Sequence, residues 1–200
     1  MADSATLTTA RPKSVAHDRP IVATLVVAAG TIGTLVVLLA TGTPLVSAVV
    51  IAMTVPAAAV DVQQRRLPNG YLLVSAFALV AGTAASALSG TSNHASGTVV
   101  GAVSMCAPLL AVHLWSPAAM GFGDVKLAVL LGAAVGTVAV PLTLVALALG
   151  AGGTSLVGIA RRKRTLPFGP GLVGGAIMAT ASHPLWIGSV TAAVSGGISR

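Results

Sequence analysis

Long uninterrupted apolar runs are the feature that most limits how this chain can fold. The first, Ile21 to Ala40, contains only apolar or small residues, and about 20 such residues are enough for a helix to cross the hydrocarbon core of a bilayer. Only 8% of the residues are charged, against about 25% in soluble domains. The 23 glycines suit closely packed membrane helices. The sequence therefore predicts an all-α, polytopic membrane helix bundle.

Short polar connectors separate the apolar runs and define the expected spans. We expect about seven transmembrane helices, within a range of six to eight. The expected spans cover 21–40, 45–60, 71–88, 97–115, 125–140 and 141–160, with a last one from about residue 172. Residues 1–20 form a polar tail that we expect to be disordered. The membrane domain then covers 21–190, and 191–200 form a C-terminal tail.

The positions of the basic residues predict the orientation of the bundle. With the N-terminal tail in the cytoplasm and seven spans, all Lys and Arg residues except Arg200 fall on the cytoplasmic side, as the positive-inside rule requires. The strongest basic run, Arg161 to Arg164, lies there too. The formal charge of +7 is therefore interpreted as a topology signal, and no nucleic-acid partner is expected.

Two carboxylates lie in the apolar part of the chain. The four acidic residues are Asp3, Asp18, Asp61 and Asp124, and the first two belong to the polar tail. Charged groups at membrane depth are costly and are functional candidates by default. The predicted orientation puts Asp61 and Asp124 at the cytoplasmic ends of different helices, where packing can bring them together.

A pair of carboxylates can act as an aspartic protease site. Close like charges do not both ionise easily, so the two groups share a proton. The ionised group takes a proton from a water, and the protonated group donates to the peptide carbonyl. Gly121 and Gly123, which have no side chains, would let a substrate backbone approach Asp124.

Two structural interpretations of the aspartates remain beside the catalytic one. Asp124 can be an N-cap or an ion-pair partner of Lys126. Asp61 can form a helix-terminal salt bridge with Arg65, four residues later.

Other catalytic signatures are missing from the sequence. The chain has no Glu, which excludes the H-E-x-x-H site of zinc proteases. It has no G-x-S-x-G element, and Cys106, its one cysteine, cannot form an internal disulfide or a cysteine-based zinc site. His113, in an apolar run, is interpreted as a hydrogen-bonded core residue rather than a metal ligand. We expect no metal and no cofactor.

Three segments resemble motifs of the type IV prepilin peptidases. Asp61 is followed by Leu67-Pro68-Asn69, as in the family's first aspartate motif. Gly121-Phe122-Gly123-Asp124-Val125-Lys126-Leu127 is similar to its G-x-G-D-x-K-L motif, and Pro167-Phe168-Gly169-Pro170 is similar to its P-F-G-P motif. The resemblance covers most of residues 45–190 and implies that Asp61 and Asp124 are the catalytic pair. The surrounding motif residues would position the substrate: Pro68, Asn69, Gly121, Gly123, Lys126, Pro167, Phe168, Gly169 and Pro170.

The resemblance also implies a substrate, a location and an activity. The chain would be a multi-pass protein of the inner (cytoplasmic) membrane that cuts the basic leader of a prepilin or pseudopilin, just after a glycine, at the cytoplasmic face. Larger members of that family carry paired Cys-x-x-Cys elements and also N-methylate the mature pilin. With one cysteine, this chain resembles instead the short, peptidase-only enzymes of tight-adherence (Flp-type) pilus systems.

A transporter is the main alternative. Two membrane aspartates can relay protons or bind a cation, but such proteins often contain an internal repeat and place their acids near the middle of the membrane. This sequence shows no repeat, and its two acids lie at predicted helix ends.

Overall fold

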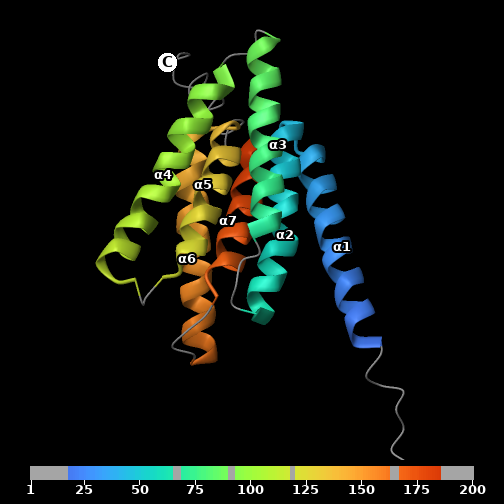
Figure 1. Ribbon diagram of the computed structural model, residues 1–200, viewed down its shortest axis with the longest axis vertical. Coiled ribbons are helices and arrows are strands. Elements are labelled where there is room, and N and C mark those ends of the chain that lie inside the picture. The colour runs from blue at the N-terminus through green and yellow to red at the C-terminus, as the bar shows by residue number, and fades with distance from the viewer. Residues whose placement is uncertain (1–17, 65–68, 90–92, 118–119, 163–166, 186–200) are drawn as a thin grey trace, which may run out of the picture.

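The computed structural model is a bundle of α-helices (Figure 1). It describes residues 18–64, 69–89, 93–117, 120–162 and 167–185. Seven helices lie within these ranges: α1 (Asp18–Ala40), α2 (Leu45–Gln64), α3 (Asn69–Leu88), α4 (Asn93–Trp115), α5 (Phe122–Gly136), α6 (Val140–Arg161) and α7 (Gly169–Ala181). The predicted fold class, an all-α membrane helix bundle, is confirmed.

Each predicted span corresponds to one helix, with differences at the ends. α2 continues past Val60 as far as Gln64, so Asp61 lies inside the helix rather than in the loop after it. Asn69 and Gly70, which precede the predicted span at 71–88, form the start of α3. The first backbone N–H groups of a helix need no intrahelical partner, and Asn is favoured at helix starts, so these residues are tolerated there.

Other helix ends also differ from the sequence-based spans, and α4 begins at Asn93, four residues before the predicted start at 97. α5 ends at Gly136, four residues before the predicted end at Val140, and its last carbonyls accept the Thr137 N–H. α7 begins at Gly169, three residues before the predicted start at Leu172. Pro170 lies in the first turn of α7, where proline's fixed φ angle and missing N–H cost nothing. The predicted tails lie outside the described residues, except that α1 begins at Asp18.

Among the helices that the structure describes, four are long and apolar enough to cross a membrane. They are α1, α3, α4 and α6, while α2 up to Asp61 and all of α7 form shorter apolar helices. The long helices expose much of their apolar surface. Within α1, only 6% of the stretch Ala23–Ala40 is buried inside the protein. Apolar surface of this extent requires a lipid environment, so the chain is an integral membrane protein.

Helix α5 is the centre of the bundle. It contacts α2, α3, α4, α6 and α7, and every residue from Leu130 to Gly136 is buried. With 15 residues, it is about 22 Å long, shorter than the hydrocarbon core of a bilayer. Because five other helices pack against α5, it does not need to span the bilayer by itself.

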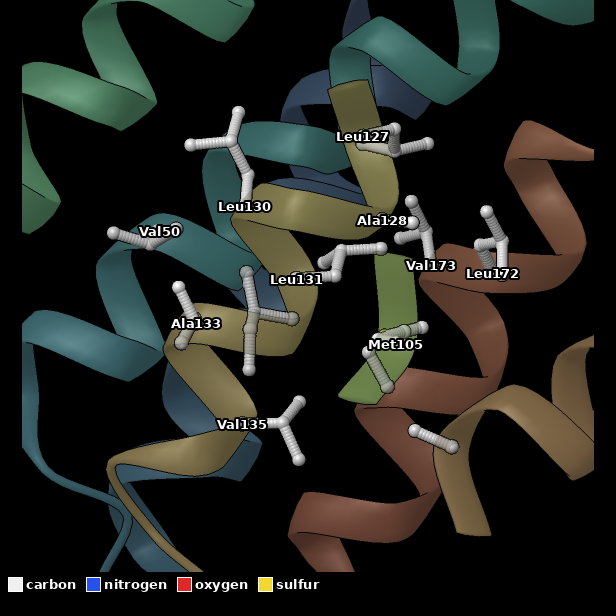
Figure 2. Packing of buried hydrophobic residues seen from close by; sticks show 14 of the residues in the cluster. Val50, Met105, Leu127, Ala128, Leu130, Leu131, Ala133, Val135, Leu172 and Val173 are labelled. Carbon is white, nitrogen blue, oxygen red and sulfur yellow. The ribbon is translucent and has the colours of Figure 1, made fainter. Parts of the chain in front are cut away.

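The core is formed mainly by apolar side chains of α5 packed against its neighbours. Figure 2 shows Leu127, Leu131 and Val135 of α5 near Met105 of α4 and Leu172 of α7. Leu127, Leu131, Val135, Met105 and Leu172 are all fully buried. This core fixes the position of α5 relative to α2, α4 and α7.

Glycines bring α4 and α5 into backbone contact. Gly97 and Gly101 of α4 face Gly136 and Gly132 of α5, and a Cβ on Gly97 would lie 2.5 Å from the Gly136 carbonyl oxygen. A Cβ on Gly132 would likewise lie 2.5 Å from the Gly101 carbonyl oxygen. We call these four residues the glycine seam. Small residues at this spacing allow membrane helices to approach closely.

The helices alternate in direction, which places particular termini at one end of the bundle. The lower end in Figure 1 carries the C-terminal ends of α2, α4 and α6 and the N-terminal ends of α1, α3, α5 and α7. Asp61, near the end of α2, and Asp124, at the start of α5, both belong to it. We call it the aspartate end and the opposite one the far end.

Candidate active site

Asp61 is buried where α2 meets the start of α7. Only 7% of its surface is exposed. A Cβ on Gly169, the first residue of α7, would lie 3.0 Å from the Asp61 Oδ2 atom and 3.5 Å from the Leu127 Cδ2 atom of α5. Glycine at 169 therefore leaves the space that the Asp61 carboxylate occupies. Residues of α2, α5 and α7 therefore meet at this place.

Asp124 occupies the first turn of α5 and is half-buried. Its backbone N–H donates to the Gly121 carbonyl at 3.1 Å, and Gly121 is the N-cap residue, with no side-chain cap hydrogen bond. The N-terminal end of a helix carries a partial positive charge, which stabilises a carboxylate in the first turn. A Cβ on Gly121 would lie 3.9 Å from the Asp124 Oδ2 atom, an ordinary distance, so packing alone does not require this glycine.

The two carboxylates interact electrostatically. Asp61 lies close enough that its negative charge acts on Asp124. The three motif segments meet around Gly169 of α7, where a Cβ would contact Asp61 of α2 and Leu127 of α5. Like charges in a partly dry site favour one shared proton, which is the arrangement that acid–base chemistry on a peptide bond requires.

Lys126 does not serve as the ion-pair partner of Asp124. Its Nζ atom lies 5.3 Å from the centroid of the Phe122 ring, a cation–π distance. Among the described residues no salt bridge joins it to Asp124. The alternative pairing of Asp61 with Arg65 involves a residue outside the described ranges.

His113 holds the segment that leads into α5. Its Nδ1 atom lies 2.8 Å from the Met120 carbonyl oxygen, and its ring centroid lies 5.5 Å from that of Phe122. Because a carbonyl oxygen only accepts, the Nδ1 atom is the donor of this hydrogen bond. The sequence identified His113 as a hydrogen-bonded residue, but gave it no role in positioning Asp124. The signal was its place near the C-terminal end of the helix before the Gly121–Asp124 motif.

The remaining predicted site residues divide into three groups. Pro167, Phe168 and Pro170 surround Gly169 at the start of α7, where Phe168 is the N-cap residue. Asn69 and Lys126 line a groove between α3 and α5. Pro68 lies outside the described residues. Within the described ranges, no group of three or more His, Cys, Asp or Glu residues has the proximity to hold a metal ion.

A comparison with protein-family models decides the class of protein. Residues 48–156 match the model of the type IV leader peptidase family. The chain belongs to the type IV leader peptidase family. It is therefore a peptidase that lies in a lipid bilayer. Neither the curated proteins nor the solved structures contain a match to the chain.

The part of this leader peptidase that matches the family includes both aspartates but not all of the site. Asp61 and Asp124 lie within residues 48–156, whereas Gly169 and the residues around it follow the matched region. The structure nevertheless brings Gly169 against Asp61. Family membership favours peptide hydrolysis over the transporter alternative.

Proposed function

We propose that the chain is a membrane aspartic endopeptidase in which Asp61 and Asp124 activate a water. Its substrates are type IV prepilins or pseudopilins of the Flp-like kind, and it removes their basic leader at the cytoplasmic membrane face. The observation that carries this proposal is the position of Asp61 and Asp124 on separate helices at one end of the bundle, where Gly169 packs against Asp61 and the Asp61 charge acts on Asp124.

The reaction needs one ionised and one protonated carboxyl group. The ionised aspartate accepts a proton from a water as the water oxygen bonds to the scissile carbonyl carbon, and the protonated aspartate donates to the carbonyl oxygen. In the second step the C–N bond breaks as the leaving nitrogen takes the proton of the aspartate that deprotonated the water, and a hydroxyl of the tetrahedral intermediate gives its proton to the other aspartate as the carbonyl forms again in a carboxylic acid. The two aspartates end the cycle with one proton between them, as they began it.

The charge distribution supports a cytoplasmic active site. Arg161 and Arg162 lie at the C-terminal end of α6, which belongs to the aspartate end (Figure 1). Lys126, in the first turns of α5, belongs to it as well. Basic residues concentrate on the cytoplasmic side of membrane proteins. The aspartate end then faces the cytoplasm in the inner membrane, level with the junction between a basic leader and the apolar helix that follows it.

A cleavage assay tests the proposal. The chain is co-expressed with a prepilin from its own source, and the prepilin is followed by its size on a blot. We expect the wild type to shorten the prepilin and Asp61→Asn and Asp124→Asn each to leave it at full length, at equal protein levels. Asn keeps the shape of the side chain but cannot exchange the proton.

Asp18→Asn provides the matched control. It makes the same chemical change at the start of α1, away from the α2–α5–α7 contact, and we expect normal cleavage. If Asp61→Asn or Asp124→Asn still cuts at the wild-type rate, that aspartate is structural and the paired mechanism is wrong.

A further inference from the structure

A groove between α3 and α5 reaches the aspartate end of the bundle and has no role in the chemistry described above. Its volume is about 480 Å³. On α3 it is lined by residues at positions i, i+3, i+4 and i+7, which form one face of a helix. On α5 it is lined by residues at i, i+3 and i+4. The residues are Asn69, Leu72, Leu73 and Ala76 of α3, and Lys126, Val129 and Leu130 of α5.

The groove has a buried floor and exposed rims. Leu72 and Leu130 form the floor and are 6% and 8% exposed, whereas Leu73 and Val129 form the rims and are 69% and 39% exposed. Ala76, with its small side chain, leaves space between them. The α3 wall extends over about 10 Å, which corresponds to about two turns of an occupant helix. Such a wall suits the helix-in-groove mode of peptide binding, in which apolar side chains three or four residues apart enter a groove.

The polar residues of the groove are at one end only. Asn69 is the first residue of α3 and Lys126 lies near the start of α5, so both mark the aspartate end. The rest of the lining is apolar. An occupant that matches this polarity has an apolar helix within the membrane and a polar segment at the cytoplasmic junction.

The groove and Asp124 lie on opposite sides of α5, so a substrate has to pass around the start of this helix to reach both. Lys126 and Asp124 lie two residues apart and therefore project on nearly opposite sides of this helix. Gly121 and Gly123, at the start of α5, place no side chain in the way. A chain that crosses over Gly121 comes into van der Waals range of Asp124, since a Cβ at Gly121 would lie 3.9 Å from the Asp124 Oδ2 atom.

We infer that the α3–α5 groove is the docking site for the membrane-inserted apolar helix of the substrate. This inference rests on the proposed function. The first two turns of the helix pack on Leu72, Ala76 and Leu130, and the leader junction, in extended form, passes the start of α5 to reach Asp61 and Asp124. The groove thereby sets which peptide bond lies between the two carboxylates.

Disulfide cross-linking tests the docking site directly. In a Cys106→Ala background, single cysteines are placed at Leu73 or Val129 and paired with single cysteines along the first three turns of the prepilin helix. We expect Leu73→Cys to cross-link to substrate positions three or four residues apart. The matched control, Val74→Cys, has the neighbouring position on α3 and a similar exposure of 60%, but lies outside the groove lining. We expect it to cross-link about fivefold less.

A substitution that fills the groove gives an independent readout. Ala76→Phe is expected to slow cleavage about tenfold at an unchanged membrane level, while Val74→Phe is expected to leave cleavage unchanged. If Ala76→Phe lowers the amount of folded protein, cross-linking through Leu73→Cys still decides the question.

Each combination of results has a distinct meaning. Groove cross-links together with aspartate-dependent cleavage support both proposals. Groove cross-links to a prepilin that the wild type never cleaves support the docking site and overturn the proposed function. Equal cross-linking from Leu73→Cys and Val74→Cys during aspartate-dependent cleavage overturns the docking site alone, and leaves the groove to lipid. The absence of both cross-linking and cleavage overturns both proposals.

Discussion

The glycine seam and the aspartate end use helix α5 in opposite ways. At the seam, Gly132 and Gly136 bring the α5 backbone against α4, with no space for a methyl group. At the aspartate end, Asp124 is half-buried, and a groove of about 480 Å³ separates α5 from α3. The C-terminal part of α5 is packed closely against α4, whereas its N-terminal part is partly exposed and carries the polar groups.

This difference indicates a division of labour along α5. The closely packed part fixes the rotation and depth of the helix, because a small shift would bring the Gly97 and Gly136 backbones into collision. The first turn of α5 then holds Asp124 at a defined position, although the side chains around Asp124 are not closely packed. Polar groups that are imperfectly packed cost stability, and the seam offsets that cost elsewhere in the same helix.

The largest effect is expected at the seam. Gly101→Ala puts a Cβ into contact with the Gly132 carbonyl oxygen and the Gly136 Cα atom, so the helices must separate. Overpacking of this kind costs about 1–3 kcal/mol. The control Gly152→Ala, on α6, meets nothing within 4 Å and should be neutral or slightly stabilising. Thermal unfolding in detergent measures both, and equal melting temperatures would contradict the role given to the seam.

An effect on activity alone is expected at Gly169. In Gly169→Ala the new Cβ would lie 3.0 Å from the Asp61 Oδ2 atom, so the carboxylate has to move by a few tenths of an ångström. Small displacements of reacting groups slow catalysis strongly, and we expect cleavage to fall about tenfold with little change in stability.

Gly174→Ala is the matched control for that change. Gly174 lies on the same helix, and a Cβ there meets nothing within 4 Å. Cleavage rates of the two variants, normalised to membrane level, decide the matter. If both cut like the wild type, the close approach of Gly169 to Asp61 has no part in the reaction.

A smaller effect on both activity and stability is expected at His113. His113→Ala removes the hydrogen bond to the Met120 carbonyl, worth about 1 kcal/mol, and frees the segment that leads to Asp124. We expect a several-fold loss of cleavage, roughly threefold. His113→Asn, which can donate from a similar position, should restore part of it. An equal loss in both variants would mean that the ring contact with Phe122, rather than the hydrogen bond, is what matters.

The smallest effect is expected at the Ser47–Thr137 contact of the far end. The Ser47 hydroxyl contacts the Thr137 hydroxyl, which also donates to the Ala134 carbonyl at 2.8 Å. Ser47→Ala leaves that second bond in place, so we expect a loss of about 0.5 kcal/mol and an unchanged cleavage rate. A strong loss of cleavage would show that the two ends are coupled rather than separate.

The sequence predicted the spans because apolar runs of this length have few alternatives in a membrane. It placed the end of α5 too late, at Val140, because the turn after Gly136 is made of Thr137, Val138 and Ala139, which include no charged residue, glycine or proline that would mark the end of a helix. Periodicity also gave no sign that α5 is central, because a helix surrounded by protein and a helix facing lipid are both apolar on all sides.

The aspartates could be selected from the sequence because charge is so rare in the apolar part. Two features of the site could not be predicted from composition or spacing alone. The approach of Gly169 to Asp61 depends on how α7 packs against α2. The groove between α3 and α5 depends on the angle between two helices that are far apart in the chain. The pattern Gly97-x-x-x-Gly101 and Gly132-x-x-x-Gly136 was a usable signal for the seam.

The central claim is that Asp61 and Asp124 act as one unit, and a double-mutant measurement tests it most directly. The wild type, Asp61→Asn, Asp124→Asn and the double variant are purified, placed in lipid vesicles and assayed for cleavage of a purified prepilin. Residues that act as a unit have non-additive effects, so we expect each single variant to lose as much activity as the double variant. Independent losses that multiply in the double variant, or a single variant that retains most of its activity, would contradict the account.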